Sequence, residues 1–560
     1  MLKKIIYIFI LMTISLTFAA CSTLQTPPVL EIDKVEGEEA VGVKDKIIIP
    51  LTKLNTIDPL KNNNITYYNF SKLIYEGLFE FDENLEISPL LAESYTIEDE
   101  GKTIVVRLKD DIYWHNGDKL TSEDIVYTIE MIKELDDASI YRGMFESALE
   151  VFKSSYIKNR INTHIVDEKT VKIYFDEIYS NNLEALTFPL VNKESYSEVG
   201  KEFIPIGTGP YKFQSYKSST SIDLLKNESY WRSEPIINKI VGRIFQDEEE
   251  ILKAFEDGRS DFAFITGVAL EEYRKNTDYR ALEYTNGEYE FLGYNFKNNL
   301  LKGDRGREVR KAIYYGIDRQ EIVEKVFLGH ATQVDIPLHP NSYLSDEGIN
   351  LYGHYANRAK AILSENGFEQ SDSDGILKDS RGSRLSFRLI TNSSNIQRME
   401  AAQIIKDNLK EIGVEIILEY PEVNPDLSGE EQLDEEWRSL VNTLESGDYD
   451  IALLGWDLSI IPDLTFMFHS DPKFRETNII AYKDEMMDSI LEESYRARRR
   501  DKQEKYKDLQ SYIIEEIPYS SLYFKNDALL VKDYIKGKMS PQFFNLYRNI
   551  EKYEIEEALE

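Results

Sequence analysis

The chain has 560 residues, enough for two or three compact units rather than one. Its 42% hydrophobic and 12% aromatic residues are sufficient to bury the cores of such units. Lys and Arg number 66 against 100 Asp and Glu, a formal net charge of −34, and a surface this acidic argues against nucleic acid as a partner.

The N-terminus has the pattern of a signal peptide over residues 1–20. Lys3 and Lys4 precede an apolar run that ends in the small pair Ala19-Ala20, which supplies the charged start, apolar middle and cleavage site of such a peptide. An uncleaved transmembrane anchor is the alternative, but the run is shorter than the roughly 20 residues that span a bilayer. We therefore expect the body of the protein outside the cytoplasm.

Cys21 is the only cysteine of the chain and directly follows this small pair. The stretch Phe18-Ala-Ala-Cys21 resembles a bacterial lipobox, in which the cysteine is lipidated and becomes the first mature residue. A reactive free thiol is the other interpretation of a lone exported cysteine. We expect lipidation, because a diacylglyceryl cysteine supplies the two acyl chains that stable anchoring needs. Residues 21–44 contain Pro27-Pro28 and no sustained periodicity, so they predict a flexible tether.

Several secondary-structure elements are predicted from local patterns. Short alternating runs indicate strands over residues 103–108, 170–175 and 385–391. Thr121 with Asp124 three residues later, and Asp318 with Glu321, predict the starts of two amphipathic helices. Their apolar stripes indicate faces that pack on a core.

The segment from residue 385 to 420 predicts a strand-helix-strand unit. A strand over 385–391 is followed by a helical pattern over 396–412, by Gly413 as a helix stop, and by a second strand over 414–420. Such a unit joins parallel strands, so at least part of the chain is an α/β domain.

A candidate site follows the apolar run of residues 451–454, which is typical of a strand buried on both faces. Gly455 and Trp456 come at its carboxyl end, where ligands of open α/β sheets bind. Glycine admits close backbone approach and tryptophan supplies a flat apolar wall. The alternative is that Trp456 is simply part of the core.

Catalytic and metal-binding patterns are absent from the sequence. The six histidines are scattered, there is no second cysteine, and no Gly-x-Ser-x-Gly motif occurs. Asp372 and Asp374 match part of a calcium loop, but two of its obligatory acids are missing, so we expect a polar turn and leave calcium binding open. The arginine-rich residues 496–500 predict a solvated helix face.

Further motifs occur in an order that resembles the extracytoplasmic solute-binding proteins of peptide ABC importers, of the oligopeptide and dipeptide type, family 5. The resemblance covers the chain from about residue 47 to its C-terminus. The matching stretches are 55–59, 74–78, 88–94, 106–109, 114–124, 207–211, 227–231, 293–296, 309–312, 316–319 and 449–456.

The resemblance implies an α/β fold of two lobes, a periplasmic-binding-protein-like clamshell of the cluster C type with an extra subdomain in the first lobe. Mapped onto this sequence, the first lobe takes residues 45–287, with the subdomain at about 73–194, and the second takes 288–524. Residues 525–560 return to the first lobe.

The family grips a peptide backbone as an added strand, which makes affinity nearly independent of side chains. The resemblance assigns this role to two segments, and it assigns the lining of the cleft to four further residues. The gripping residues are Asn63, Asn64 and Ile65 with Gly455, Trp456 and Asp457, and the lining residues are Tyr141, Thr266, Tyr294 and Asn295.

One position departs from the family pattern. Many members have an aspartate three residues after the tryptophan, which pairs with the α-amino group of the ligand, and this chain has Ser459 there. A desolvated ammonium needs a charged partner that a serine hydroxyl does not supply. Either Asp457 or Asp463 takes over this role, or the ligand runs through the site, lacks a free amine or is not a peptide.

The expected function is that of a lipid-anchored, monomeric protein that captures oligopeptides and delivers them to the permease of an ABC importer, without catalysis or cofactor. A receptor for a peptide signal with the same fold is the alternative, as is a binder of a non-peptide ligand. An exported hydrolase is disfavoured by the missing catalytic groups.

Overall fold

The computed structural model describes residues 45–135, 141, 161–196, 203–275, 278–346, 348, 351–371 and 373–556. Met1–Val43 and Lys44–Glu560 are separate units, and the description concerns the second. The predicted signal peptide, Cys21 and the tether lie outside the described residues, as does Asp372.

A four-stranded sheet combines the first strand of the described chain with three later ones, in the order β1-β10-β9-β8. β1 is parallel to β10, and the other neighbours are antiparallel. A Cβ atom at Gly242 of β10 would lie 2.7 Å from the Phe70 ring, so α1 packs directly on this sheet. The bounds are β1 Lys46–Thr52, α1 Ile65–Ser71, β8 Tyr211–Lys217, β9 Ser221–Lys226 and β10 Lys239–Phe245.

A second four-stranded sheet, in the order β4-β5-β7-β6, is antiparallel throughout. β5 (Thr103–Leu108) and β7 (Thr170–Phe175) confirm two of the predicted strands, and β4 and β6 are Ala92–Glu98 and Ile161–Asp167. The predicted capping box is also confirmed, because the Thr121 N–H and hydroxyl donate to Asp124 at the start of α2 (Ser122–Lys133).

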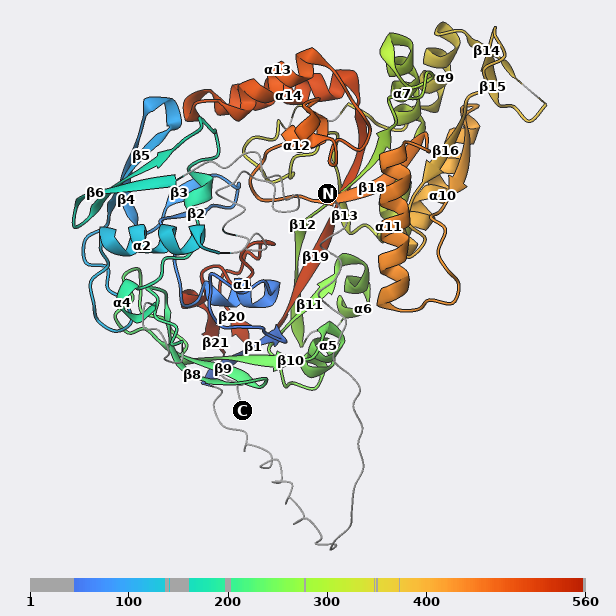
Figure 1. The fold of residues 1–560 in the computed structure, drawn as a ribbon. Coiled ribbons are helices and arrows are strands. Elements are labelled where there is room, and N and C mark those ends of the chain that lie inside the picture. The colour runs from blue at the N-terminus through green and yellow to red at the C-terminus, as the bar shows by residue number, and fades with distance from the viewer. Residues whose placement is uncertain are drawn as a thin grey trace, which may run out of the picture. The chain divides into compact units, whose positions relative to one another are not determined.

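The largest sheet has seven strands, with the path β11-β19-β12-β18-β16-β17 and β13 paired to β19. Its long antiparallel strands β12 (Tyr279–Tyr294) and β19 (Tyr519–Lys532) run beside each other (Figure 1). Their register shifts between Thr285 and Tyr289 and again between Glu290 and Phe291. The predicted lobe boundaries, 287/288 and 524/525, fall at this irregular stretch, and the division into lobes stays a prediction.

The predicted strand-helix-strand unit is confirmed at the other side of this sheet. β16 (Ser386–Ile390) and β17 (Glu415–Glu419) are parallel and joined through α10 (Ile396–Glu411). Gly413 has φ +83°, in the left-handed region that favours glycine after a helix. β18 (Ile451–Asp457) is parallel to β16 and antiparallel to β12. The fold is therefore mixed α/β with several sheets, as the sequence predicts.

The remaining elements connect or cover these sheets. They are β2 Phe79–Phe81, β3 Ile87–Pro89, η1 Asp99–Gly101, η2 Glu184–Leu186, α4 Lys193–Tyr196, α5 Glu248–Glu256, β11 Phe262–Thr266, η3 Gly267–Ala269, α6 Leu270–Tyr273, α7 Gly303–Gly316, α8 Arg319–Val326, β13 Ala331–Gln333, α9 Ala356–Glu365, β14 Phe368–Ser371, β15 Leu377–Asp379, α11 Glu430–Ser446, α12 Thr465–Phe468, η4 Pro472–Phe474, α13 Glu485–Tyr495, η5 Arg499–Asp501, α14 Lys502–Glu516, β20 Ile535–Lys536, η6 Ile550–Lys552 and β21 Glu554–Ile555.

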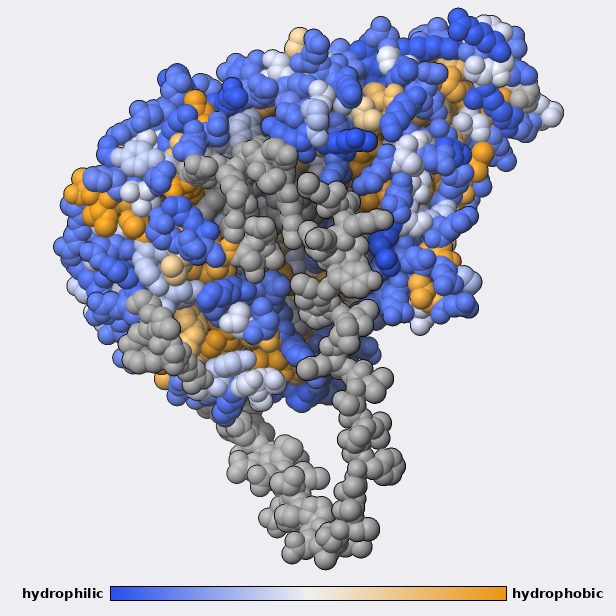
Figure 2. Space-filling model, in the orientation of Figure 1, coloured by the Kyte–Doolittle hydropathy of each residue, from blue (hydrophilic) through white to orange (hydrophobic). Residues whose placement is uncertain are grey.

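The visible surface of the described residues is largely hydrophilic, with apolar residues in small separate groups (Figure 2). Within the described part of the chain, none of the helices combines the length and the hydropathy that spanning a bilayer requires.

The arginine-rich stretch 496–500 differs from its prediction. It forms a turn and the short helix η5 rather than a solvated helix face. The Arg498 guanidinium lies 2.6 Å from Glu100, and that of Arg499 lies 3.1 Å from Glu86. The stretch therefore contacts a distant part of the chain.

Candidate functional site

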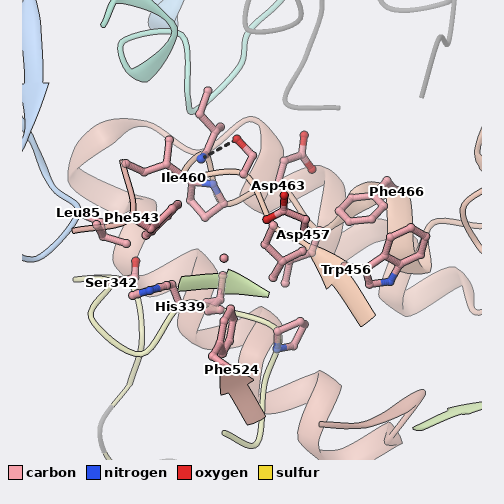
Figure 3. A pocket seen from close by; sticks show the side chains of 18 residues that line it. Leu85, His339, Ser342, Trp456, Asp457, Ile460, Asp463, Phe466, Phe524 and Phe543 are labelled. Carbon is pink, nitrogen blue, oxygen red and sulfur yellow. Dashed lines mark hydrogen bonds between the residues drawn. The ribbon is translucent and has the colours of Figure 1, made fainter. Parts of the chain in front are cut away.

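A pocket of about 50 Å³ lies at the carboxyl end of β18 (Figure 3). Residues 456–464 form one wall, residues 337–339 with Ser342 form another, and Leu85, Gly287, Phe466, Phe524 and Phe543 complete the lining. Most of these side chains are apolar, and the segments that supply them are far apart in the sequence. An apolar lining with a few polar groups is typical of ligand sites.

Trp456 belongs both to the pocket wall and to the edge of the core. It is half-buried, and its ring stacks on Phe291 with centroids 6.3 Å apart and meets Phe466 edge to face at 5.3 Å. The preceding residues of β18 are buried, as expected for a central strand. Trp456 therefore packs on core rings and also lines the pocket, and its role as a ligand-binding residue stays a prediction.

Asp457 presents a carboxylate to the pocket. Among the described residues it has no ion-pair partner and accepts no hydrogen bond, and Glu288 lies directly opposite it in the pairing of β12 with β18. A Cβ atom at Gly287 would lie 2.8 Å from Asp457 Oδ1, so the backbone approaches the carboxylate closely there. Solvent reaches the group, yet enclosure by protein atoms, together with Glu288, raises the pKa of the Asp457 carboxyl above its usual range.

Asp463 lies in the same wall, but its carboxylate oxygens already accept hydrogen bonds from other protein groups. Its Oδ1 accepts the Thr465 N–H at 2.9 Å, and its Oδ2 accepts the Tyr179 hydroxyl at 3.3 Å. Burial raises the pKa of the Asp463 carboxyl. The Ser459 hydroxyl, in turn, accepts the Ile461 N–H at 3.2 Å. Of the two acids that are candidates to pair with a ligand amine, only Asp457 is open to one.

His339 contributes a neutral aromatic ring to the pocket lining. Its Nε2 lies 3.3 Å from the Thr285 carbonyl and its Nδ1 accepts the Asn341 N–H at 3.2 Å, so Nε2 carries the proton. Burial lowers the pKa of His339 to about 4, which leaves the ring neutral near pH 7. The ring stacks on Phe543, with centroids 5.3 Å apart, and meets Phe524 edge to face at 5.4 Å.

The segment predicted to grip the ligand from the first lobe does not line this pocket. Asn63 and Ile65 are exposed at the start of α1, and Asn64 caps that helix by accepting the Thr66 N–H at 2.9 Å. Thr266 is exposed at the end of β11. None of these predicted residues is among those that form the pocket.

Tyr294 and Asn295 are buried and occupied by internal contacts. The Tyr294 hydroxyl is 2.5 Å from that of Ser520, and the Asn295 amide donates to the carbonyls of Gly447 and Tyr449 at 3.0 and 2.7 Å. Tyr294 links β12 to β19, Asn295 links the end of β12 to the turn before β18, and both lie outside the pocket lining.

Gly455 and Tyr141 have other positions. A Cβ atom at Gly455 would lie 2.7 Å from both Arg398 and Glu290, so glycine leaves room for the ion pair between the half-buried Arg398 and the buried Glu290, whose closest atoms are 2.8 Å apart. Tyr141 is buried and lines a second cavity. Of the eleven predicted site residues, the structure brings Trp456, Asp457 and Ser459 together in the pocket.

The described residues contain no group of three or more His, Cys, Asp or Glu side chains arranged to hold a metal ion. In the partial calcium loop, the Asp374 carboxylate is paired with the Arg384 guanidinium.

Comparisons with protein families and with curated proteins both point to solute-binding proteins. Residues 86–477 match the profile described as "Bacterial extracellular solute-binding proteins, family 5 Middle". The chain is 25% identical over 558 residues to the oligopeptide-binding protein AppA of Bacillus subtilis, covering 97% of both chains. It is 26% identical over 338 residues to the glutathione-binding protein GsiB of Escherichia coli O157:H7, covering 59% of this chain and 62% of GsiB.

Solved structures with the same fold include AppA of Bacillus subtilis in complex with a nonapeptide, with a TM-score of 0.58, 23% identity, and coverage of 91% of this chain and 98% of that one. NikZ of Campylobacter jejuni in complex with Ni(L-His) aligns with a TM-score of 0.62 and 23% identity, covering 91% and 99%.

Proposed function

The chain belongs to the family 5 bacterial extracellular solute-binding proteins, which bind solutes for ABC transporters and are not enzymes, and we propose that its solute is an oligopeptide. The observation that carries this proposal is the pocket at the end of β18, where aromatic and aliphatic walls surround one open carboxylate, that of Asp457. This combination suits a ligand with apolar side chains and an amine.

The edge of β18 supports a grip on the ligand backbone. β16 pairs with β18 only at Ile451 and Ala452, whereas β12 pairs along the whole strand to Asp457. Among the described residues, the last part of β18 therefore has a neighbouring strand on one edge only. An extended peptide added at such an edge would gain main-chain hydrogen bonds independent of its side chains.

Asp457 is the proposed partner of the ligand's α-amino group. Its carboxylate is open to the pocket, whereas the oxygens of Asp463 already accept hydrogen bonds from Thr465 and Tyr179. An ammonium placed against Asp457 would replace lost hydration with a charge-assisted hydrogen bond. With Asp457 in this role, the ligand's amine has a charged partner even though Ser459 occupies the position where many family members have an aspartate.

The proposed site of action is the outer face of the membrane, beside the permease, with Cys21 lipidated and residues 21–44 as the tether. Cys21→Ala should move the protein from the membrane fraction to the soluble extracellular fraction. If this variant stays in the membrane fraction, the N-terminal segment is an uncleaved anchor instead.

Native mass spectrometry of the full chain, purified without added ligand and then offered a random nonapeptide library, tests the proposed ligand class. Retained or newly bound peptides are expected. Glutathione and Ni(L-His) serve as comparison ligands, because the glutathione-binding protein GsiB is similar in sequence and NikZ in complex with Ni(L-His) has the same fold. Binding of either in preference to every peptide would contradict the proposal.

A further inference from the structure

A third cavity, of about 400 Å³, is lined by residues within the segments 97–104, 179–184 and 497–500. It shares no lining residue with the pocket at the end of β18. Tyr179 lines this cavity and donates its hydroxyl, at 3.3 Å, to Asp463 of the pocket wall. The two spaces are therefore separate, and this hydrogen bond joins their walls.

Each charged side chain that lines the third cavity is ion-paired within the protein. The pairs are Arg498 with Glu100 at 2.6 Å, Arg499 with Glu86 at 3.1 Å, Arg500 with Asp501 at 3.3 Å, and Glu184 with Lys502 at 2.5 Å. Because these charges already balance one another, the cavity does not call for a charged ligand.

Glu184 nevertheless keeps one acceptor free. Its side chain is 4% exposed, and its Oε2 is buried and accepts no hydrogen bond from the described residues. The three donors of the Lys502 ammonium are used by Glu184 Oε1, the Asn181 side-chain oxygen and the Ser180 carbonyl, at 2.5, 2.6 and 3.3 Å. Lys502 therefore has no further proton for Glu184 Oε2.

Ser180 supplies a second open group. Its Oγ is buried and has no hydrogen-bond partner in the described part of the chain. Aliphatic side chains complete much of the lining, among them Ile97, Ile104 and Leu183. Buried polar atoms without a partner are unfavourable, so these two point to a group that completes the site. The lining suits a ligand with an apolar body and a hydrogen-bond donor.

We propose that the third cavity binds a small neutral molecule with an apolar body and a hydroxyl group, that is, an alcohol or a phenol. The hydroxyl donates to Glu184 Oε2, with Ser180 Oγ as a second partner, and the body packs on the aliphatic side chains. A hydrogen bond to an ionised acceptor is stronger than one between neutral groups. A neutral donor gains this bond without the cost of burying another charge. This site is independent of the proposed peptide pocket.

The test compares two probes that differ in one donor. Both 4-fluorophenol and 4-fluoroanisole have a fluorinated ring, but only the phenol donates a hydrogen bond. Each is titrated into the full chain and followed by fluorine NMR. The phenol should bind about tenfold more tightly, the worth of a hydrogen bond to a charged group. In Glu184→Gln and in Ser180→Ala, this preference should shrink.

Ser233→Ala is the matched control for Ser180→Ala, because Ser233 is exposed and lines none of the three spaces. It should keep the wild-type preference for the phenol. Equal affinity of the two probes for the wild-type chain, or no binding of either, overturns the inference, and neither result depends on the folding of a variant.

A competition titration identifies the cavity that the probe occupies. With the tightest-binding nonapeptide of the library present in excess, 4-fluorophenol should still bind, because the two spaces share no lining residue. Displacement of the probe by the nonapeptide would place it in the pocket at the end of β18 and overturn the inference. Both outcomes leave the proposed function intact, whereas a library without any binder contradicts the proposed function itself.

Discussion

The segment from Asp457, the last residue of β18, to Asp463 has two halves with different surroundings. At its start, Asp457 faces an open pocket and has no partner among the described residues, whereas at its end Asp463 is bonded to Thr465 and Tyr179. The pKa of both carboxyls is raised by burial. A shifted pKa alone therefore does not identify a binding group, and the hydrogen-bond partners distinguish the two.

The second half is part of a larger contact between distant segments. Ser180 donates its N–H to the Tyr495 carbonyl at 2.6 Å, next to the packed rings of Tyr179 and Tyr495. The Lys502 ammonium lies 2.5 Å from Glu184, with 1% and 4% of these side chains exposed. Through Tyr179, the Asp463 half is joined to this contact, whereas the Asp457 carboxylate has no partner among the described residues.

The largest expected effect concerns the held half. Lys502→Met leaves the Glu184 carboxylate buried without its cation, and such a loss costs about 3 kcal/mol or more in the free energy of unfolding. Chemical denaturation measures it. The double variant Lys502→Met/Glu184→Leu should regain most of this loss, because it removes both charges. A single variant as stable as the wild type would show that this contact does not support the fold.

The next effect concerns the open half. Trp456→Ala should weaken the nonapeptide selected from the library by about 2 kcal/mol, the range of residues that dominate an interface. Titration calorimetry measures it, and peptide binding to the wild type should change tryptophan fluorescence. Trp437→Ala is the control, since Trp437 is 60% exposed on α11 and lines no pocket described above. If the Trp456→Ala and Trp437→Ala variants bind the peptide equally tightly, Trp456 has only a structural role.

A direct comparison of the two acids follows. Asp457→Asn should weaken binding of the free-amine peptide about tenfold, and N-acetylation of the peptide should remove this difference. Asp463→Asn should instead lower stability by about 1 kcal/mol and preserve the preference for a free amine. Because the pKa of Asp457 is raised, wild-type affinity should begin to fall at a higher pH than for an ordinary aspartate as the solution is acidified. Loss of amine preference in the Asp463 variant would reverse the assignment.

The smallest effect concerns Asp527, which accepts the Asn286 amide at 2.9 Å beside the pocket residue Gly287. Burial, with a contribution from Glu288, raises the pKa of Asp527 to about 6. The folded pKa exceeds the unfolded value of about 3.9, so the stability it contributes is present below about pH 4 and lost as the pH rises through about 6.

Asp527→Asn, which keeps an acceptor for Asn286, should therefore be about 1 kcal/mol more stable than the wild type at pH 8, with the difference vanishing near pH 4. Denaturant unfolding across this range measures it. A constant difference at all pH values would mean that Asp527 does not titrate in the folded protein as described.

Local elements were predictable because neighbours in the sequence determine them. The Thr121–Asp124 pair and Gly413 mark a helix start and a helix end through contacts within a few residues. The strand at 451–454 was also predictable, because its apolar run is contiguous, and Trp456 follows it at the edge of the pocket.

The rest of the pocket could not be found this way. Leu85, His339, Phe524 and Phe543 meet only in the folded chain, and nothing near each of them in the sequence indicates a ligand. The arginines at 498 and 499 were misjudged for the same reason, since Glu100 and Glu86 are about 400 residues away. Asp463 differs from Asp457 in its bonds to the nearby Thr465 and to Tyr179, and sequence patterns do not bring Tyr179 near it.

The pairing of Glu288 with Asp457 has a consequence for handling the protein. Two carboxylates lie opposite each other on β12 and β18, and Lys525, 2.6 Å from Glu288, neutralises only one of them. On the proposed function, the ammonium of the peptide is the cation that pairs with Asp457. Without peptide, the two carboxylates repel each other and share the single cation Lys525. Removing a bound peptide during purification should then lower the melting temperature. A thermal melt of the freshly purified protein, compared with protein stripped of ligand, would show whether peptide was bound in the cell.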